Sequence, residues 1–239
     1  MSKVTSAAHF NNHTETHRGT TMSGKFRILC FGDSLTWGWI PTAGAPPTQR
    51  YALEQRWPGA MLDVLGEGYE IIEEGLSGRT TEVDDPLDPR LNAAAYLPSA
   101  LASHLPLDLV IVMLGTNDTK RIFDRSAFQI THGISRLMGM ISGCSGGVGT
   151  SYQAPRAMLV APPVLGNLAH PWQAAKYEGA RQKTQEMATL YAAFADYTNI
   201  AFIDAGSVIS TDGCDGIHLT AQNNIDLGRA IAGKVRGLS

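Results

Sequence analysis

Hydrophobic residues along this chain gather in five short runs, which are separated by longer segments of mixed polarity. Each run has the length of a β-strand, and several of the segments between them are long enough to form helices. Short apolar runs that alternate with helical patterns are typical of βαβ units, in which helices cover both faces of a parallel sheet. We therefore predict an α/β domain with a five-stranded parallel sheet, its strands at residues 27–31, 69–73, 109–114, 157–161 and 200–203.

Two segments carry a helical pattern that can be read from their apolar residues. Within 172–197, four apolar side chains recur at three- and four-residue steps and therefore share one helical face: Met187, Leu190, Tyr191 and Phe194. We interpret this stripe as core packing. A last helix is predicted from about Ala221 to Val235.

Three other segments, at 41–49, 84–98 and 162–171, are rich in Pro, Gly or Ala, and we predict them to be irregular loops. Loops of this length inside a compact α/β domain usually carry function. In open α/β sheets the ligand crevice lies beyond the carboxyl ends of the strands. Reactive side chains are therefore expected directly after strands.

The length of 239 residues, without an internal repeat or a linker, fits one large domain. We assign this domain to residues 23–239. Residues 1–22 are polar and poor in helix formers, so we interpret them as a disordered extension. Three histidines of this extension recur at four-residue spacing and are interpreted as solvated rather than as a metal site: His9, His13 and His17.

Composition and charge exclude several classes of function. A net charge of -3 gives no global attraction to polyphosphate, so nucleic acid is not expected as a partner. No stretch reaches the roughly 18 to 20 apolar residues that span a membrane, and the start lacks the apolar region of a signal peptide. The charged fraction of 17% lies below the roughly 25% usual for soluble domains. A low charged fraction is compatible with some surface being buried between subunits.

The three cysteines are odd in number and form no CxxC pair, so we predict neither a disulfide framework nor a zinc site at Cys30, Cys144 and Cys214. A reducing cytoplasm fits this pattern best. We also expect no metal at three histidines that lack clustered carboxylate or cysteine ligands: His104, His132 and His170.

A serine stands where the first strand turns towards a helix, in the sequence Phe31-Gly32-Asp33-Ser34-Leu35. A side chain at this point is exposed at the edge of the sheet, which makes Ser34 a candidate nucleophile. Asp and Ser are also common helix caps, so simple capping of the next helix explains the same residues equally well.

Two further strands are followed by groups that could donate hydrogen bonds into the same crevice. Gly78 follows the second strand, and a glycine lets the backbone approach a ligand and point its N–H at it. Asn117 follows the third strand and places a side-chain amide at the same edge. Ordinary turn chemistry would also explain an asparagine at this position.

Asp215 and His218 lie three residues apart after the fifth strand. At this spacing the carboxylate can hold the imidazole N–H and select its tautomer, as the activation of a nucleophile requires. A surface histidine beside a helix capped by Thr220 would explain the motif equally well. The combination is more specific, because four features after four different strands together supply a nucleophile, a base, an orienting carboxylate and oxyanion donors.

In these features the chain resembles the GDSL/SGNH hydrolases. Gly32-Asp33-Ser34-Leu35 matches the block that names the family, and Gly78, Gly115-Thr116-Asn117-Asp118 and Asp215-x-x-His218 look like its other blocks. From about Lys25 onwards, segments such as Leu35-Thr36-Trp37-Gly38-Trp39 are similar to the bacterial arylesterase and acyltransferase branch, sometimes called perhydrolases. The resemblance implies a three-layer, flavodoxin-like fold, no cofactor, and an oligomer with a confined active site.

The resemblance also implies a reaction. Ser34 would attack small carboxylic esters, His218 would act as the base and Asp215 would orient it. The backbone N–H groups of Ser34 and Gly78 and the side-chain amide of Asn117 would form the oxyanion hole. Water, an alcohol or peroxide would then accept the acyl group. The expected substrate pocket comprises Asp33, Leu35, Trp37, Trp39, Thr116 and Ile217. Core packing would explain each of the two tryptophans equally well.

One feature departs from the family pattern, in which an asparagine commonly precedes the glycines of the second block. Glu73 and Glu74 stand here instead, which puts the local support of that loop in question. The G-x-S-x-G pattern at 143–147 lacks the strand before and the helix after that a nucleophile elbow requires, so we interpret it as a connector. Two rival functions stay open: a carbohydrate acetyl esterase with the same triad, and a non-enzymatic flavodoxin-like ligand binder.

Overall fold

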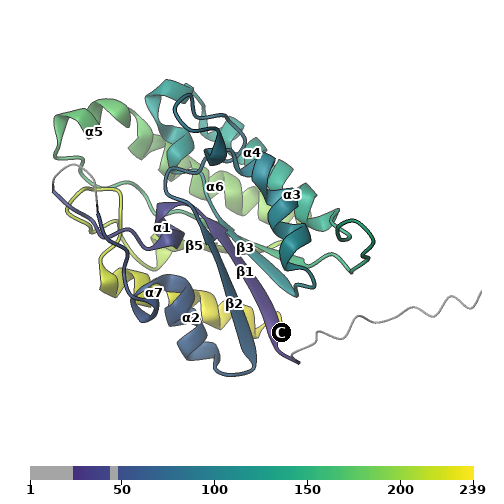
Figure 1. Ribbon diagram of the computed structural model, residues 1–239. Helices are drawn as coiled ribbons and strands as arrows, with labels where there is room; N and C mark the ends of the chain where they lie inside the picture. The colour runs from purple at the N-terminus through teal and green to yellow at the C-terminus, as the bar shows by residue number, and fades with distance from the viewer. Residues whose placement is uncertain (1–23, 44–47) are drawn as a thin grey trace, which may run out of the picture.

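The computed structural model describes residues 24–43 and 48–239. The predicted extension at 1–22, with its three histidines, lies outside the described residues, as does the 44–47 part of the predicted loop at 41–49. In the described chain, a parallel β-sheet lies between two layers of helices, as Figure 1 shows.

The sheet has five parallel strands in the order β2-β1-β3-β4-β5. This is the flavodoxin-like strand order, and it confirms the predicted three-layer α/β fold. Each strand begins and ends within two residues of its predicted run. The strands are β1 (Phe26–Gly32), β2 (Tyr69–Gly75), β3 (Leu109–Met113), β4 (Arg156–Ala161) and β5 (Ala201–Asp204).

The central strands are apolar along their length because both of their faces are covered. Successive side chains of a strand point to opposite faces, so one strand contributes to two cores. Leu29 and Phe31 of β1 pack into the first core, together with helices α3 (Ala93–His104), α4 (Ala127–Ser142) and α6 (Ala180–Thr198). Ile28 and Cys30 pack into the second core, together with helices α2 (Trp57–Leu65) and α7 (Ala221–Arg236).

Helices α2 (Trp57–Leu65) and α7 (Ala221–Arg236) cover one face of the sheet. Helices α3 (Ala93–His104), α4 (Ala127–Ser142) and α6 (Ala180–Thr198) cover the other (Figure 1). Two short helices, α1 (Ser34–Trp37) and α5 (Pro171–Lys176), lie beyond the carboxyl ends of the strands. Single 3₁₀ turns occur at Leu53–Gln55, Pro89–Leu91, Asn117–Thr119, Arg121–Phe123 and Ala205–Ser207.

The structure corrects two of the predicted boundaries. The segment 84–98 is not wholly irregular, since α3 begins at Ala93 and includes Pro98. Asn92 caps this helix by accepting a hydrogen bond from the Ala95 N–H, and the alanine-rich sequence carries the helix past the proline. The helical pattern at 172–197 belongs to two helices, because the chain turns at Gly179 between α5 and α6.

The apolar stripe of α6 packs into the core as predicted. Met187 and Tyr191 are fully buried, and Leu190 and Phe194 pack against the same cluster. The predicted connector at 143–147 follows α4 and precedes β4. A helix rather than a strand therefore leads into its serine, which is not the geometry of a nucleophile elbow.

No helix in the described part of the chain is long and apolar enough to cross a membrane. Within 24–43 and 48–239, no group of three or more His, Cys, Asp or Glu side chains is placed to hold a metal ion. The three cysteines are free thiols.

The packing of α7 on α2 depends on a glycine. A Cβ atom at Gly228 would lie 2.5 Å from the carbonyl oxygen of Trp57, 2.9 Å from the Cβ of Ala60 and 3.0 Å from the backbone nitrogen of Met61. Two of these neighbours are backbone atoms, which cannot rotate away. The two helices therefore approach each other more closely than any side chain at Gly228 would allow.

We expect Gly228→Ala to lower the free energy of unfolding by about 1 to 3 kcal/mol through overpacking, although alanine is the better helix former. Gly233→Ala in the same helix is the matched control, since a Cβ there meets nothing within 4 Å. This control should raise the free energy of unfolding by up to about 1 kcal/mol. Urea unfolding of both variants measures the two changes, and a stabilised Gly228→Ala would contradict the close helix contact.

Candidate active site

Ser34 stands at the first position of α1, immediately after β1. Asp33 is the N-cap of this helix, and its Oδ1 accepts a hydrogen bond from the Leu35 N–H at 2.9 Å. The capping explanation therefore holds for Asp33. It leaves the Ser34 hydroxyl free to face another group.

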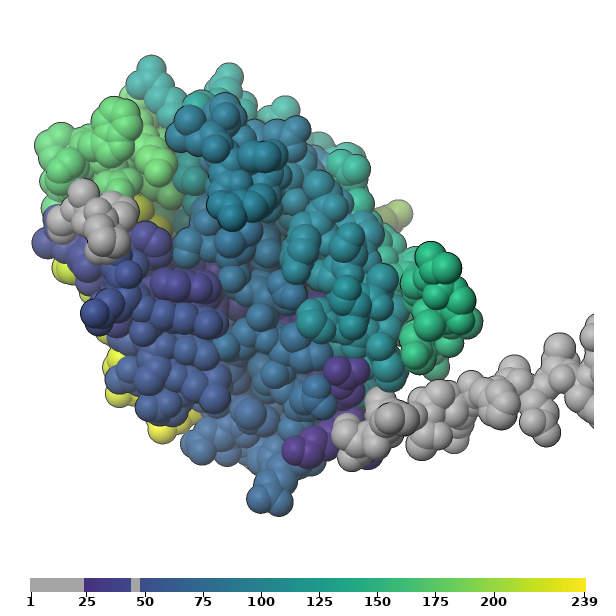
Figure 2. Space-filling model, viewed as in Figure 1, coloured from purple at the N-terminus to yellow at the C-terminus, as the bar shows by residue number. Residues whose placement is uncertain are grey.

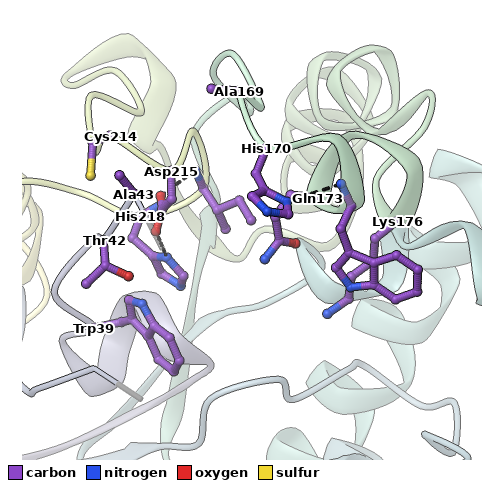
Figure 3. A pocket seen from close by; sticks show the side chains of 12 residues that line it. Trp39, Thr42, Ala43, Ala169, His170, Gln173, Lys176, Cys214, Asp215 and His218 are labelled. Carbon is purple, nitrogen blue, oxygen red and sulfur yellow. Dashed lines mark hydrogen bonds and ion pairs between the residues drawn. The ribbon is translucent and has the colours of Figure 1, made fainter. Parts of the chain in front are cut away.

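Ser34, His218 and Asp215 form a continuous chain of hydrogen bonds. His218 Nε2 lies 2.9 Å from Ser34 Oγ, and His218 Nδ1 lies 2.7 Å from Asp215 Oδ2. The other carboxylate oxygen of Asp215 accepts the backbone N–H groups of Ile217 and His218, both at 2.9 Å. Figure 3 shows the pairing of His218 with Asp215. The sheet thus brings together two motifs that are 184 residues apart.

The surroundings of the three side chains favour a charged Asp215 and a fixed imidazole. Partial burial raises the pKa of Asp215, but the hydrogen bonds and charge of His218 and the N–H of Ile217 outweigh it, so the pKa lies below its usual value. The ring of Trp39 stacks on His218 with centroids 5.0 Å apart and an interplanar angle of 15°. Because Asp215 accepts the Nδ1 proton, Nε2 is left as the acceptor for the Ser34 hydroxyl.

Three candidate oxyanion donors lie near this serine. In the described chain, the N–H groups of Ser34 and Gly78 have no hydrogen-bond acceptor. Gly78 has a φ of 91°, which a residue with a side chain rarely adopts. The amide nitrogen of Asn117 lies 3.2 Å from Asp33 Oδ2 and 3.1 Å from the carbonyl oxygen of Arg79.

The Asn117 side chain is held from both of its ends. Besides the two acceptors of its nitrogen, its Oδ1 accepts a hydrogen bond from the Tyr177 hydroxyl at 3.4 Å. Asp33 is buried, and this burial raises its pKa to about 6, although the Leu35 N–H and the charge of His218 act in the opposite direction. The side chains of Asp33, Asn117 and Tyr177 therefore form a buried network beside the triad.

The two glutamates that depart from the family pattern both have partners. Glu73 accepts hydrogen bonds from Arg56 Nε at 2.9 Å and Arg56 Nη2 at 2.7 Å, and it pairs with Arg50 at 3.0 Å. Glu74 lies 2.9 Å from Nε2 of His104 on α3. These contacts join the end of β2 to the segment before α2 and to α3, so the loop after β2 is supported by the two arginine pairs of Glu73 and by the hydrogen bond between Glu74 and His104.

A cavity of about 370 Å³ opens beside His218, as the close view in Figure 3 shows. One wall comes from the segment after α1 and from the loop that carries the triad pair, and the other comes from α5 and the loop before it. In Figure 2, α5 (green) and the chain after α1 (purple) lie at the same end of the molecule. The described lining residues are Trp39, Thr42, Ala43, Ala169, His170, Trp172, Gln173, Lys176, Cys214, Asp215, Ile217 and His218.

The predicted pocket residues lie at different depths. Trp39 and Ile217 line the cavity. Trp37 lies behind Trp39 and does not line the cavity; the centroids of the two rings are 6.2 Å apart. The guanidinium carbon of Arg50 lies over the Trp37 ring, 5.5 Å from its centroid. Like Trp37, three more predicted residues are not among the described lining: Leu35 belongs to the core between the sheet and α7, and Asp33 and Thr116 are buried beneath the site.

Sequence reasoning missed the wall that α5 provides. The signal there is His170-Pro171-Trp172, because a proline in the first turn marks the start of a helix. Such a signal does not show how the helix is oriented in the fold, and no local sequence pattern shows that α5 faces Ser34, Asp215 and His218. The contact of Tyr177 with Asn117 could not be predicted for the same reason, because it joins residues that are 60 positions apart.

Comparison with known proteins agrees with this site. A model of the GDSL-like lipase/acylhydrolase family matches residues 30–223. A solved carbohydrate acetylesterase from Sinorhizobium meliloti is 57% identical, with a TM-score of 0.88, and the match covers 90% of this chain and 100% of that one. The native aryl esterase of M. smegmatis is also 57% identical, with a TM-score of 0.87, over 89% of this chain and 99% of that one.

A carbohydrate acetylesterase family member from Sinorhizobium meliloti is 39% identical, with a TM-score of 0.83, over 89% of this chain and 98% of that one. No curated protein matches the chain. The relatives named here are esterases, so a non-enzymatic ligand binder is set aside. The chain belongs to the GDSL-like lipase/acylhydrolase family, and it is an esterase of that family.

Proposed function

We propose that this chain hydrolyses small carboxylic esters through an acyl intermediate on Ser34, and that alcohols or peroxide can replace water as acyl acceptor. The observation that carries the proposal is the pair of hydrogen bonds at His218: Nε2 accepts from Ser34 Oγ at 2.9 Å, and Nδ1 donates to Asp215 Oδ2 at 2.7 Å. In an esterase, this arrangement activates a serine for attack on the ester carbonyl.

In the first half of the reaction, Ser34 Oγ bonds to the ester carbonyl carbon while His218 Nε2 takes the hydroxyl proton. Asp215 holds the other ring N–H and stabilises the imidazolium. His218 then gives its proton to the alcohol oxygen as the ester C–O bond breaks. In the second half, His218 takes a proton from water, an alcohol or peroxide as its oxygen attacks the acyl carbon. His218 then returns this proton to Ser34 Oγ as the bond between Oγ and the acyl carbon breaks.

The negative oxygen of each tetrahedral intermediate would be bound by the N–H groups of Ser34 and Gly78 and by the Asn117 amide. This oxygen would compete with Asp33 for one amide hydrogen, which lies at the long distance of 3.2 Å from the carboxylate. The Arg79 carbonyl accepts the other amide hydrogen and would keep the amide oriented when the oxyanion binds. Each such donor contributes roughly 100- to 1000-fold to the rate.

The shape of the cavity supports small substrates. Its volume of about 370 Å³ is near the lower end of small-molecule sites, which span roughly 300 to 1000 Å³. Trp39, Trp172 and Ile217 give it apolar surface, which favours a short acyl group and an aryl or alkyl alcohol. The 57% identical relative from M. smegmatis is described as an aryl esterase, which supports the same substrate class.

A carbohydrate acetyl ester is the second candidate substrate. Polar side chains also line the cavity, among them His170, Gln173 and Lys176, and a relative of equal identity is described as a carbohydrate acetylesterase. Polar groups around an aromatic surface can bind hydroxyl groups of a sugar. The ratio of kcat/KM for phenyl acetate to that for an acetylated monosaccharide separates the two substrate classes.

We also propose that the protein works as a homo-oligomer in the cytoplasm. Large apolar side chains are exposed at the surface, including Trp172 at 70% beside the cavity and Phe128 at 68% on α4. Such side chains are candidates for burial between subunits. The free thiols of the three cysteines support a reducing compartment.

Ser34→Ala and His218→Ala are each expected to fold normally and to lose at least roughly 1000-fold in kcat for phenyl acetate, because covalent catalysis needs both groups. The matched control is Ser145→Ala, which removes the serine of the G-x-S-x-G pattern and should keep wild-type kcat. An organophosphonate should label the wild type at Ser34, as read by mass spectrometry. A tenth or more of the wild-type rate in either variant would exclude this triad.

Asn117→Ala should lower kcat by roughly 100-fold with little change in KM, if its amide binds the oxyanion mainly in the transition state. Steady-state kinetics on phenyl acetate measures both constants, and circular dichroism checks that the buried site is still folded. An unchanged kcat would remove Asn117 from the oxyanion hole.

Acyl transfer is expected to compete with hydrolysis in mostly aqueous solution. Burial of each CH₂ of an alcohol in an apolar pocket contributes about 0.8 kcal/mol, which offsets part of the concentration advantage of water. With phenyl acetate and increasing benzyl alcohol, chromatography should show benzyl acetate gaining on acetate. Trp172→Ala should lower this ratio, and Tyr197→Ala, an exposed aromatic residue on α6, is the control. Hydrolysis alone at every alcohol concentration would refute acyl transfer.

A further inference from the structure

Arg79 is a buried cation, only 2% exposed, and it follows directly after Gly78. No step of the reaction above uses it. Its side chain and backbone nevertheless contact each of the three segments that carry the oxyanion donors. We propose that Arg79 is a positioning residue that holds these segments at the spacing the oxyanion hole requires, an inference that rests on the proposed roles of Gly78 and Asn117.

The side chain of Arg79 joins the ends of β1 and β2. Its Nη1 donates to the carbonyl oxygen of Gly32 at 2.9 Å and also to that of Glu74. Gly32 lies two residues before Ser34, and Glu74 is the next-to-last residue of β2. The guanidinium therefore ties the start of the nucleophile turn to the start of the loop that carries Gly78.

The backbone of Arg79 supplies the other two connections. Its N–H donates to the carbonyl oxygen of Leu76 at 3.1 Å, which closes the turn that contains Gly78. Its own carbonyl oxygen accepts the Asn117 amide at 3.1 Å. A shift of Arg79 would thus move the Gly78 N–H and the Asn117 amide together, relative to Ser34.

The surroundings of Arg79 fit a positioning role better than a purely stabilising one. The guanidinium carbon lies over the rings of Phe31, at 4.2 Å, and Tyr96, at 5.3 Å, which leaves it little freedom to move. Its Nε is buried and has no hydrogen-bond partner in the described chain. Burial of a charged group with an unpaired donor is unfavourable, and an apolar side chain of similar size often replaces such a group without loss of stability.

Arg79→Met tests the proposal because it keeps the apolar stem and removes the guanidinium. Its kcat for phenyl acetate should fall by about 10- to 100-fold, with little change in KM. The upper value of this range corresponds to the loss of one oxyanion donor. Added methylguanidinium should restore part of the kcat of Arg79→Ala. A merely structural role would change stability without this split between kcat and KM.

Arg90→Met is the matched control. Arg90 lines the same cavity of about 460 Å³ as Arg79, but its side chain is 79% exposed and pairs with Asp88. This variant should keep wild-type kcat and KM, and methylguanidinium should not affect it.

A double-mutant cycle with Asn117→Ala decides whether Arg79 acts through the oxyanion hole. We expect Arg79→Met to cost much less kcat in the Asn117→Ala background than in the wild type. Wild-type kcat in Arg79→Met, or a full and additive loss in the double variant, would overturn the proposal. If Arg79→Met does not fold, Arg79→Lys replaces it in the cycle with the same criteria, and absence of rescue in folded Arg79→Ala counts against the proposal.

This result is separable from failure of the proposed function. An unchanged kcat in Asn117→Ala would refute the oxyanion hole itself, whatever Arg79 does. A defective Asn117→Ala together with a normal Arg79→Met would refute only the role of Arg79. Phosphonate labelling of Ser34 in the wild type reports the nucleophile independently of both.

Discussion

The parallel register of the three central strands is the constraint on which the site depends. Gly32 pairs with Gly75 of β2 and with Met113 of β3, so the three strands end at one level. Backbone hydrogen bonds hold neighbouring strands about 4.8 Å apart. The segments that follow these strands therefore start side by side, and they carry Ser34, the proposed nucleophile, and the proposed donors Gly78 and Asn117. The sheet thus sets the coarse geometry of the site before any side chain contributes.

Buried polar groups then refine this geometry. Asp33 caps α1 and holds Asn117, and Asp118 accepts both the N–H and the hydroxyl of Thr81, at 3.0 and 2.6 Å. Burial raises the pKa of Asp33 and of Asp118 to about 6, partly opposed by their hydrogen bonds. A buried carboxylate without hydrogen-bond partners is strongly destabilised, so each of these contacts resists displacement. These contacts link the loops around Ser34 on the side of the proposed oxyanion hole.

The position of His218 depends mainly on contacts within its own loop. Asp215 orients His218 across three residues, and the Gly213 N–H donates to the His218 carbonyl at 2.9 Å. Asp212 accepts both the N–H and the hydroxyl of Thr220, which in turn caps α7. The cap of α7 and the Asp215–His218 pair are thus parts of one loop. Because α7 follows this loop directly, the packing of α7 against α2 places the loop beside Ser34.

The sequence by itself determined the strands, the nucleophile turn and the Asp215–His218 pair, because each depends on a period, a turn or a spacing of a few residues. Only the tertiary structure decided what surrounds them. Leu35 follows the nucleophile directly yet packs into the core, whereas α5, more than 130 residues away, forms a pocket wall. Arg79 likewise gains its contacts from three separate segments. Such placements result from many weak contacts between elements distant in the chain, which no local pattern records.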